Sequence, residues 1–350
     1  MKNIYGGKMK KLLISILLGA FLFSCGSNSE NTSKSEEKLV FYAGLQEDHA
    51  ALIAEKFTAE TGIPTEFVRM SSGETLARLK AEKNNMVASV WYGGPVDGII
   101  AADAEGLVEA YNSPTAEEIL DQFKSGDGRW TGIYVGYLGF VGNKKILKEK
   151  GLEMPKSWQD LLDPKFKGEI VVAHPGSSGT AYTMLATLVQ LMGEEQAMSY
   201  FKQLDGQIRQ YTKSGTAPGR MVGSGEVALG ITFLHDAIKY QKERYSDIII
   251  SSPNEGTGYE IGAVALLKNA PNSTAAKKFI DWVLTKEVQE LGKTVGSFQF
   301  LTNKNAVAPE EAEPIKNTKL INYDFEWAGK NRKNLVEKYT KETSSTIPQK

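Results

Sequence analysis

The chain has 350 residues and an ordinary composition for a globular protein, with 41% hydrophobic and 24% charged residues and a formal net charge of −1. A charge so close to zero gives no field that would attract nucleic acid or an acidic surface, so we expect neither as a partner. Without its N-terminal segment, the chain is still long enough for two domains.

The N-terminus has the pattern of an export signal. Lys8, Lys10 and Lys11 precede an apolar run over 12–23 that is too short for a stable membrane span. Met1 and Met9 are alternative starts, because the sequence from Met9 already contains a charged start and an apolar core.

Cys25 ends this run in the order Leu-Phe-Ser-Cys, which resembles the cleavage box of bacterial lipoproteins. It is the only cysteine in the sequence, whereas exported proteins usually pair their cysteines or have none. We therefore expect a signal peptide over 1–25, a lipidated Cys25 as the only membrane attachment, and a flexible tether over 26–37. The expected location is the periplasm or another extracytoplasmic space.

Strands and helices alternate in the pattern that follows the tether. Short apolar runs closed by glycine or polar residues indicate the strands, and apolar residues at helical spacing indicate the helices. In chain order we expect a strand over 38–44, a helix from about 50 to 61, a strand over 65–70, a helix within 71–84 and a strand over 88–94.

The alternation resumes further along the chain. The expected elements are a strand over 133–142, a strand over 169–173, a loop over 174–179, a helix ending near 193, a helix over 195–204, a strand ending at 233 with a helix starting at Asp236, a strand over 261–269, helices over 274–284 and 286–295, and a C-terminal helix over about 324–340.

Repeated strand, loop and helix units predict an α/β fold with parallel sheets covered on both faces. We expect two parallel-sheet-based lobes joined by a two-strand hinge. Ligands of open α/β sheets bind beyond the carboxyl ends of the strands, so the cleft between the lobes is the expected site. The predicted boundaries are 38–135 and 268–350 for lobe 1, 136–267 for lobe 2, and 133–142 and 261–267 for the hinge.

Four stretches together resemble the solute-binding proteins of bacterial ABC importers, namely "LVFYAGLQEDHAALIAEKFTAETGI", "WYGGPVDGIIAADAEGLVEAY", "PKSWQDLLDPKFKGEIVVAHPGSSGTAY" and "GEVALGIT". The resemblance covers nearly everything after the tether and is to the ferric-ion-binding branch of the type II periplasmic binding proteins. It implies two lobes that close on a ligand and deliver it to a membrane permease with its ATPase, and it implies no enzymatic activity.

The resemblance also bears on the ligand. Iron-binding members of the branch place a histidine in the first loop and two adjacent tyrosines after the strand that here ends in ITFLHD, where this chain has Gln46 and the pair His235 and Asp236. Relatives that bind phosphorylated hexoses carry a His-Asp pair at this position. The resemblance therefore implies that His235 and Asp236, joined by Glu260, contact a hexose phosphate or a similar oxyanion.

Three loops rich in glycine and hydroxyl groups follow expected strands. Hydroxyls and the exposed amides of a helix start suit an anion such as phosphate, although the same residues are typical of ordinary helix capping. The candidates are Ser177, Ser178, Gly179 and Thr180 in the first loop, Ser72 and Thr75 in the second, and Ser214 and Thr216 in the third.

Several further residues have two interpretations each. Trp91 either stacks on a sugar face or packs in the interior, and the glycines at 93 and 94 permit a close backbone approach to a ligand. Asp236 either binds ligand or caps a helix. We expect His49 to face solvent and His174 to be structural. The candidates in the strand end WYGG are thus Trp91, Gly93 and Gly94.

Two other functions fit parts of the sequence. Ferric iron requires phenolate ligands in this branch, for which the candidates are Tyr42, Tyr134, Tyr137 and Tyr259. A secreted serine hydrolase would pair Ser177 or Ser178 with His235, but GSSG is not the Gly-x-Ser-x-Gly elbow. We expect no resident metal, no cofactor and a monomer.

Overall fold

The computed structural model describes residues 38–348. The predicted signal peptide, Cys25 and the tether over 26–37 lie outside the described residues. No helix within 38–348 has the length and apolar character needed to cross a membrane.

The described residues form a mixed sheet with the central order β2-β1-β3-β10-β5-β8-β6-β7, while β4, β9 and β11 pair beside this path. The strands are β1 (Leu39–Ala43), β2 (Thr65–Arg69), β3 (Val90–Pro95), β4 (Val108–Glu109), β5 (Thr131–Asn143), β6 (Ile170–Ala173), β7 (Ile208–Thr212), β8 (Leu229–Phe233), β9 (Ile248–Ser251), β10 (Tyr259–Leu267) and β11 (Phe300–Leu301).

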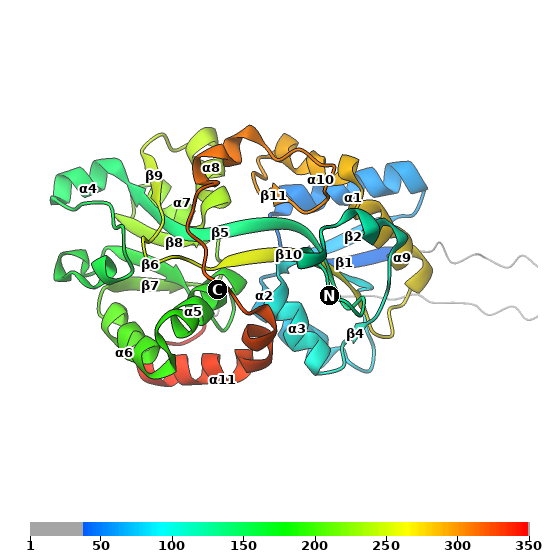
Figure 1. Cartoon of the computed structure of the whole chain (residues 1–350), viewed down its shortest axis with the longest axis horizontal. Coiled ribbons are helices and arrows are strands. Elements are labelled where there is room, and N and C mark those ends of the chain that lie inside the picture. Colours follow the sequence, from blue (N-terminus) through cyan, green and yellow to red (C-terminus); the bar gives the residue numbers. More distant parts are fainter. Residues whose placement is uncertain (1–37, 349–350) are drawn as a thin grey trace, which may run out of the picture. The chain divides into compact units, whose positions relative to one another are not determined.

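Helices connect these strands and cover the sheet (Figure 1). They are α1 (Glu47–Thr61), α2 (Ser72–Ala81), α3 (Val96–Ala104), α4 (Lys144–Lys150), α5 (Gly179–Met192), α6 (Glu194–Asp205), α7 (Ala217–Gly223), α8 (Leu234–Glu243), α9 (Ser273–Val283), α10 (Lys286–Leu291) and α11 (Phe325–Thr343).

The strand β5 belongs to two halves of the sheet. Its residues 131–137 pair with β10 in what we call the first half-sheet, which also contains β1 to β4 and β11. Its residues 138–143 pair with β8 and β9 in the second half-sheet, which also contains β6 and β7. Figure 1 shows β5 as the long arrow between the two halves.

The pairing is parallel at the outer strands and antiparallel in the middle. β1 lies parallel to β2 and β3, and β6 lies parallel to β7 and β8, as the alternating pattern predicts. The strand β5 enters the second half-sheet from the first, and β10 enters the first half-sheet from the second. For this reason both strands are antiparallel to their neighbours. The second connection between the halves runs over 252–258, from β9 to β10, whereas 261–267 pairs within the first half-sheet.

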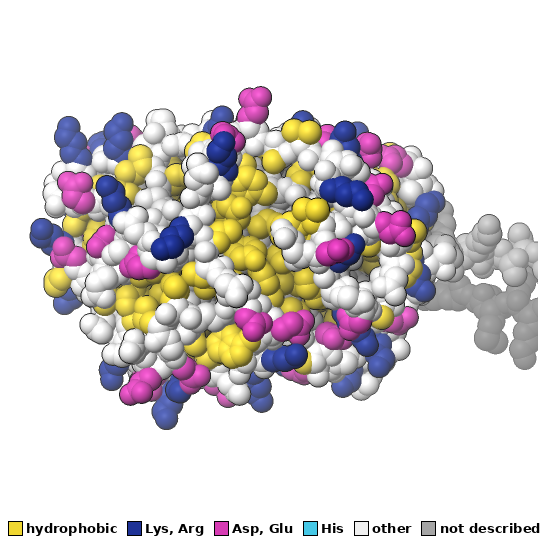
Figure 2. Space-filling view, in the orientation of Figure 1, with side chains coloured by type: hydrophobic (Ala, Val, Ile, Leu, Met, Phe, Trp, Pro, Cys, Tyr) yellow, Lys and Arg dark blue, Asp and Glu magenta, His cyan; other side chains and the backbone are white. Residues whose placement is uncertain are grey.

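Each half-sheet has its own apolar core. In the first half, Phe41 stacks on Phe279 with ring centroids 5.1 Å apart, which seats α9 on the sheet. In the second half, Phe140 meets Trp158 edge to face at 5.1 Å. On the face in Figure 2, hydrophobic side chains gather over the middle, where β5 and β10 run, and charged side chains surround them.

The C-terminal helix α11 packs against helices of both halves, α3 on one side and α5 and α6 on the other. An ion pair fixes it to α3, since Arg332 Nη1 donates to Asp97 Oδ1 at 2.6 Å and both side chains are buried. The Arg332 guanidinium also lies 4.2 Å from the centre of the Tyr182 ring on α5. Burial raises the pKa of Asp97 to about 7, although Arg332 opposes this rise.

We expect Arg332→Ala to lower the free energy of unfolding by about 3–5 kcal/mol, because it leaves the Asp97 carboxyl buried without its partner. Urea denaturation measures the loss. The matched control is Lys330→Ala on the same helix, whose ion pair with Glu326 is exposed and contributes less than about 1 kcal/mol. A loss for Arg332→Ala no larger than that of the control would contradict the assignment.

Candidate functional site

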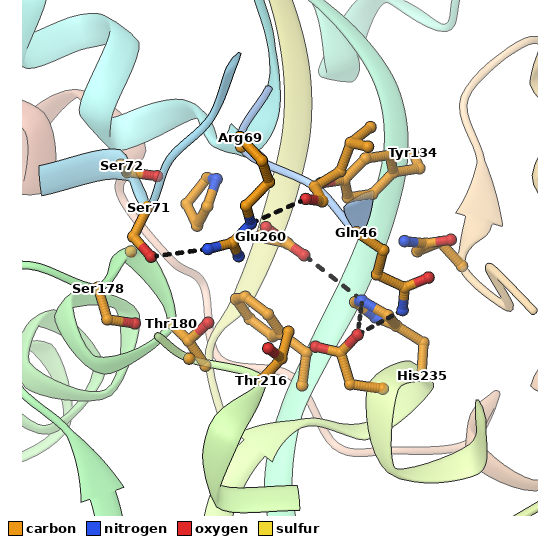
Figure 3. Close-up of a pocket in the computed structure, with 18 residues that line it drawn as sticks. Gln46, Arg69, Ser71, Ser72, Tyr134, Ser178, Thr180, Thr216, His235 and Glu260 are labelled. Atoms are coloured by element: carbon orange, nitrogen blue, oxygen red, sulfur yellow. Dashed lines mark hydrogen bonds and ion pairs between the residues drawn. The ribbon is translucent and has the colours of Figure 1, made fainter. Parts of the chain in front are cut away.

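A pocket of about 420 Å³, partly open to solvent, lies where the two half-sheets meet. Its walls come from both halves, with Arg69 at the end of β2, Ser72 in α2, Ser178 at the start of α5, Asp236 in α8 and Glu260 in β10 (Figure 3).

One end of the pocket is formed by the starts of α2 and α5. Ser71 caps α2 through a capping box with Glu74, and Ser178 caps α5 by accepting a hydrogen bond from the amide of Ala181 at 3.3 Å. The first amides of a helix have no acceptor within the helix, and the positive end of the helix dipole lies there. Ser72 and Gly179 occupy these first positions and line the pocket.

Arg69 supplies a positive charge to the pocket beside Ser71, the capping residue of α2 (Figure 3). Its guanidinium donates to the carbonyl of Leu45 and to Ser71 Oγ, both at 3.3 Å. None of the carboxylates within 38–348 lies within 4 Å of this guanidinium. The charge of Arg69 is therefore available to a ligand.

The other end of the pocket carries acidic groups and a histidine. His235 and Asp236 lie in the first turn of α8, and His235 Nε2 is 3.7 Å from Asp236 Oδ1 and 3.9 Å from Glu260 Oε1. Gln46 Nε2 donates to Asp236 Oδ1 at 2.5 Å. All four side chains line the pocket, and Tyr134 lies beside them (Figure 3).

The prediction that α8 starts at Asp236 is wrong by two residues. The helix begins at Leu234, after Phe233, and no side chain caps it. Leu234 is an apolar residue that packs with Ile238 and Phe298, and this packing draws the backbone into the helix earlier. Asp236 is therefore not a capping residue, and its carboxylate faces the pocket.

Burial changes the protonation of this end of the pocket. It raises the pKa of Glu260 well above its usual range, with further contributions from Asp236 and Asp97, so the neutral carboxylic acid is favoured. Burial lowers the pKa of His235, and Asp236 only partly opposes this. Burial also raises the pKa of Tyr134, with Glu260 adding to the rise. Neutral groups that can donate and accept hydrogen bonds thus surround one carboxylate.

The strand β5 makes room for these groups at Gly136. Gly136 is paired with Glu260 on β10, and a β-carbon at this position would lie 2.6 Å from His235 Nδ1 and 2.9 Å from Glu260 Oε1. Any larger residue would collide with both side chains. The site therefore requires glycine at this point of the shared strand.

The structure brings nine of the fifteen predicted binding residues to the walls of this pocket, namely Gln46, Ser72, Ser178, Gly179, Thr180, Thr216, His235, Asp236 and Glu260. The other six do not line it, namely Thr75, Trp91, Gly93, Gly94, Ser177 and Ser214.

The hydroxyls outside the pocket are engaged in local hydrogen bonds. Ser177 Oγ donates to the carbonyls of His174 and Lys213 at 3.2 and 3.0 Å, and Thr75 Oγ1 donates to the carbonyl of Ser71 at 3.3 Å. Ser214 Oγ lies 3.0 Å from Thr216 Oγ1. These three side chains stabilise the loops that carry the pocket residues.

The strand end WYGG is a turn behind the pocket. Trp91 is fully buried and donates from Nε1 to the carbonyl of Gly93 at 3.0 Å. Gly93 and Gly94 have φ angles of 78° and 82°, which residues with a side chain rarely adopt. The amide of Gly94 donates to Tyr134 Oη at 2.9 Å, which leaves the hydroxyl proton of Tyr134 for another acceptor.

Four polar residues of the pocket were not predicted as sugar-phosphate contacts, namely Arg69, Ser71, Tyr134 and Gln299. Arg69 and Ser71 follow directly from the rule that ligands bind beyond strand ends, because they lie at and just after the end of β2. Gln299 lies outside helices and strands, in a segment whose path no periodicity reveals.

Of the tyrosines considered for ferric iron, only Tyr134 lines the pocket. Tyr42 donates to Glu82, Tyr137 packs on Phe300 and Tyr259 packs on Phe325. Within the described part of the chain, no group of three or more His, Cys, Asp or Glu side chains is placed to hold a metal ion.

The two remaining histidines are both buried. His174 Nε2 lies 3.1 Å from Ser345 Oγ, in keeping with a structural role. The prediction that His49 faces solvent is wrong, since its side chain is covered by the segment around Ser297 and is only 5% exposed. Neither Ser177 nor Ser178 has a hydrogen bond to His235 among the described residues.

Residues 100–327 match the family model for bacterial extracellular solute-binding proteins, and the chain belongs to this family. Members bind small molecules outside the cytoplasm and work with an ABC permease as non-enzymatic components of transport. The fold is that of the two-lobed type II periplasmic binding proteins.

Three relatives describe the chain's position within the family. An uncharacterized protein of Haemophilus influenzae is 41% identical over 342 residues, which cover 95% of this chain and 99% of the relative. The periplasmic binding protein AfuA from Actinobacillus pleuropneumoniae, solved with exogenous fructose-6-phosphate bound, is 42% identical, with a TM-score of 0.85 over 88% of this chain and 99% of AfuA. The ferric binding protein from Campylobacter jejuni shares the fold at 21% identity, with a TM-score of 0.75 over 87% of this chain and 99% of that protein.

The lowered pKa of His235 makes stability depend on pH. The unfolded chain binds a proton at this histidine below about pH 6.5, while the folded protein keeps it neutral to lower pH, so stability is lost as the pH falls. We expect His235→Gln, which stays neutral, to lose less free energy of unfolding between pH 7.5 and pH 5 than the natural protein. Urea denaturation at both pH values measures the difference, and equal losses would refute it.

Proposed function

We propose that this protein captures a hexose phosphate between its two lobes and delivers it to an ABC permease. The observation that carries the proposal is the division of one pocket into two chemically different ends. Helix starts and Arg69 form one end, and His235, Asp236 and Glu260 form the other.

The phosphate group fits the end formed by the helix starts. The first amides of α2 and α5, at Ser72 and Gly179, the hydroxyls of Ser72, Thr180 and Thr216, and the guanidinium of Arg69 can donate hydrogen bonds to phosphate oxygens. The charge of Arg69 is not neutralised by a carboxylate within hydrogen-bonding distance among the described residues. This end therefore favours a dianion.

The sugar hydroxyls fit the opposite end. Asp236 accepts hydrogen bonds, the neutral Glu260 and His235 each donate and accept, and hydroxyl groups do both. A phosphate next to the Asp236 carboxylate would be repelled, so the orientation of the ligand is fixed by charge. The 42% identity with AfuA, whose solved structure contains fructose-6-phosphate, supports the same ligand class.

Calorimetry tests the proposal with glucose 6-phosphate, inorganic phosphate and ferric citrate in parallel. We expect glucose 6-phosphate to bind. Arg69→Met should weaken the binding of both glucose 6-phosphate and inorganic phosphate by about 10- to 100-fold, because a charge-assisted hydrogen bond is lost. Asp236→Asn should weaken the binding of glucose 6-phosphate alone.

The matched control for Arg69→Met is Arg209→Met, an exposed arginine in β7 that does not line the pocket, and it should leave all affinities unchanged. Absence of binding heat with glucose 6-phosphate would contradict the proposal. Binding of ferric citrate, with an absorption band from Tyr134 phenolate, would replace it with iron transport.

The lipid anchor is a separate proposal that rests on the sequence around Cys25. We expect the natural protein to sediment with membranes and Cys25→Ser to appear in the soluble extracytoplasmic fraction, since the two or more acyl chains of a lipoprotein give stable attachment. Fractionation with mass spectrometry of the N-terminus checks this. A Cys25→Ser protein that stays with the membrane would argue against lipidation.

We propose that the mature protein is a monomer.

A further inference from the structure

A series of hydrogen bonds, which we call the relay, leads away from Asp236 through Gln46 and Ser297 to His49, a histidine that does not line the pocket. Gln46 Nε2 donates to Asp236 Oδ1 at 2.5 Å, and Ser297 Oγ donates to Gln46 Oε1 at 2.9 Å. Ser297 Oγ lies 3.0 Å from His49 Nδ1. The relay runs from α8 of the second half to α1 of the first half. Ser297 belongs to a third segment, just before β11.

The donor and the acceptor of each hydrogen bond in the relay follow from the chemistry of the groups involved. A carboxylate only accepts, so the Gln46 amide must turn its NH₂ group to Asp236 and its oxygen to Ser297. Ser297 has a single proton, which goes to the Gln46 oxygen. The hydroxyl oxygen of Ser297 must then accept a hydrogen bond from His49, which requires a proton on Nδ1 and, in the neutral ring, none on Nε2.

The surroundings of His49 hold this ring in place. The side chain is buried, and Nε2 has no hydrogen-bond partner within the described residues. The edge of the ring faces Tyr92 at 6.4 Å between centroids, and a β-carbon on Gly292 would lie 2.9 Å from its Cε1 atom. Burial lowers the pKa of His49 to about 4, with Lys239 acting in the same direction and Asp48 opposing, so the ring is neutral at neutral pH.

We propose that His49 and Ser297 are positioning residues that fix the orientation of the Gln46 amide and thereby select hydroxyl-bearing ligands at Asp236. With the amide held, Asp236 Oδ1 is occupied and the rest of the carboxylate is directed to the ligand. Without Ser297, the Gln46 oxygen loses its donor, so the amide is held at its NH₂ end alone and its position beside Asp236 is less fixed. The choice of ligand in this inference rests on the proposed function, whereas the hydrogen bonds of the relay are independent of it.

The relay acts at one end of the pocket only, and this gives it a specific signature. We expect Ser297→Ala to weaken glucose 6-phosphate by about 10-fold, the loss of roughly one hydrogen bond, and to change the affinity for inorganic phosphate by less than about 2-fold. Ser297→Thr, which keeps the hydroxyl, should restore the natural ratio of the two affinities. A purely structural role of Ser297 would lower both affinities together.

Nitrogen-15 NMR of the histidine rings tests the relay without any ligand. The chain contains only three histidines, so His49→Asn assigns the signals of His49. We expect a protonated Nδ1 and a bare Nε2 in the natural protein, and loss of that preference in Ser297→Ala but not in Ser297→Thr.

The two measurements separate the possible failures. A protein that binds no sugar phosphate but shows the Nδ1-protonated ring refutes the proposed ligand and keeps the relay. A natural protein with the proton on His49 Nε2 overturns the relay, and so does an unchanged ratio of the two affinities in Ser297→Ala.

Discussion

The site depends on a steric constraint in β5. This strand passes from one half-sheet to the other directly behind the pocket, and at Gly136 it carries no side chain. The space so created lets His235 from the second half and Glu260 from the first half approach to 3.9 Å. Because both groups are buried, their protonation is set by the packing around β5 rather than by solvent.

Contacts between the halves surround this point. The amide of Gly73 in α2 donates to the carbonyl of Ser177 at 2.9 Å, and Lys213 forms an ion pair with Glu74 at 2.6 Å. On the other side of the pocket, Lys239 of α8 forms an ion pair with Asp48 of α1. Polar contacts of this kind are individually weak where they are exposed, so a ligand that touches both halves adds substantially to their association.

Much of the fold follows from periodicity in the sequence. Buried strands such as β6 and β10 are nearly continuous apolar runs, and α9 and α11 have apolar residues at helical spacing. The antiparallel placement of β5 and β10 does not follow, because it depends on which half of the sheet each strand enters. The start of α8 at Leu234 was missed for a related reason, since a distant residue, Phe298, packs on it.

The candidate site was predictable to the extent that it obeys the strand-end rule. Ser178 and Thr180 follow β6, and Thr216 follows β7, and all three line the pocket. Arg69 obeys the same rule after β2, but a single arginine in an ordinary amphipathic stretch has no distinctive spacing. His49 could not be predicted, because its partner Ser297 lies 248 residues away and no pattern joins them.

The two ends of the pocket differ in how easily they can change over evolution. At the starts of α2 and α5, the donors include backbone amides, which are present whatever the side chain, provided that the helix begins at the same residue. At the opposite end the imidazole, carboxyl and amide groups of His235, Asp236, Glu260 and Gln46 all belong to side chains, so a single codon change alters the hydrogen-bonding pattern. A descendant of this gene can therefore acquire a new choice of ligand by substitutions at Asp236 or Gln46 while keeping the helix starts that attract an anion.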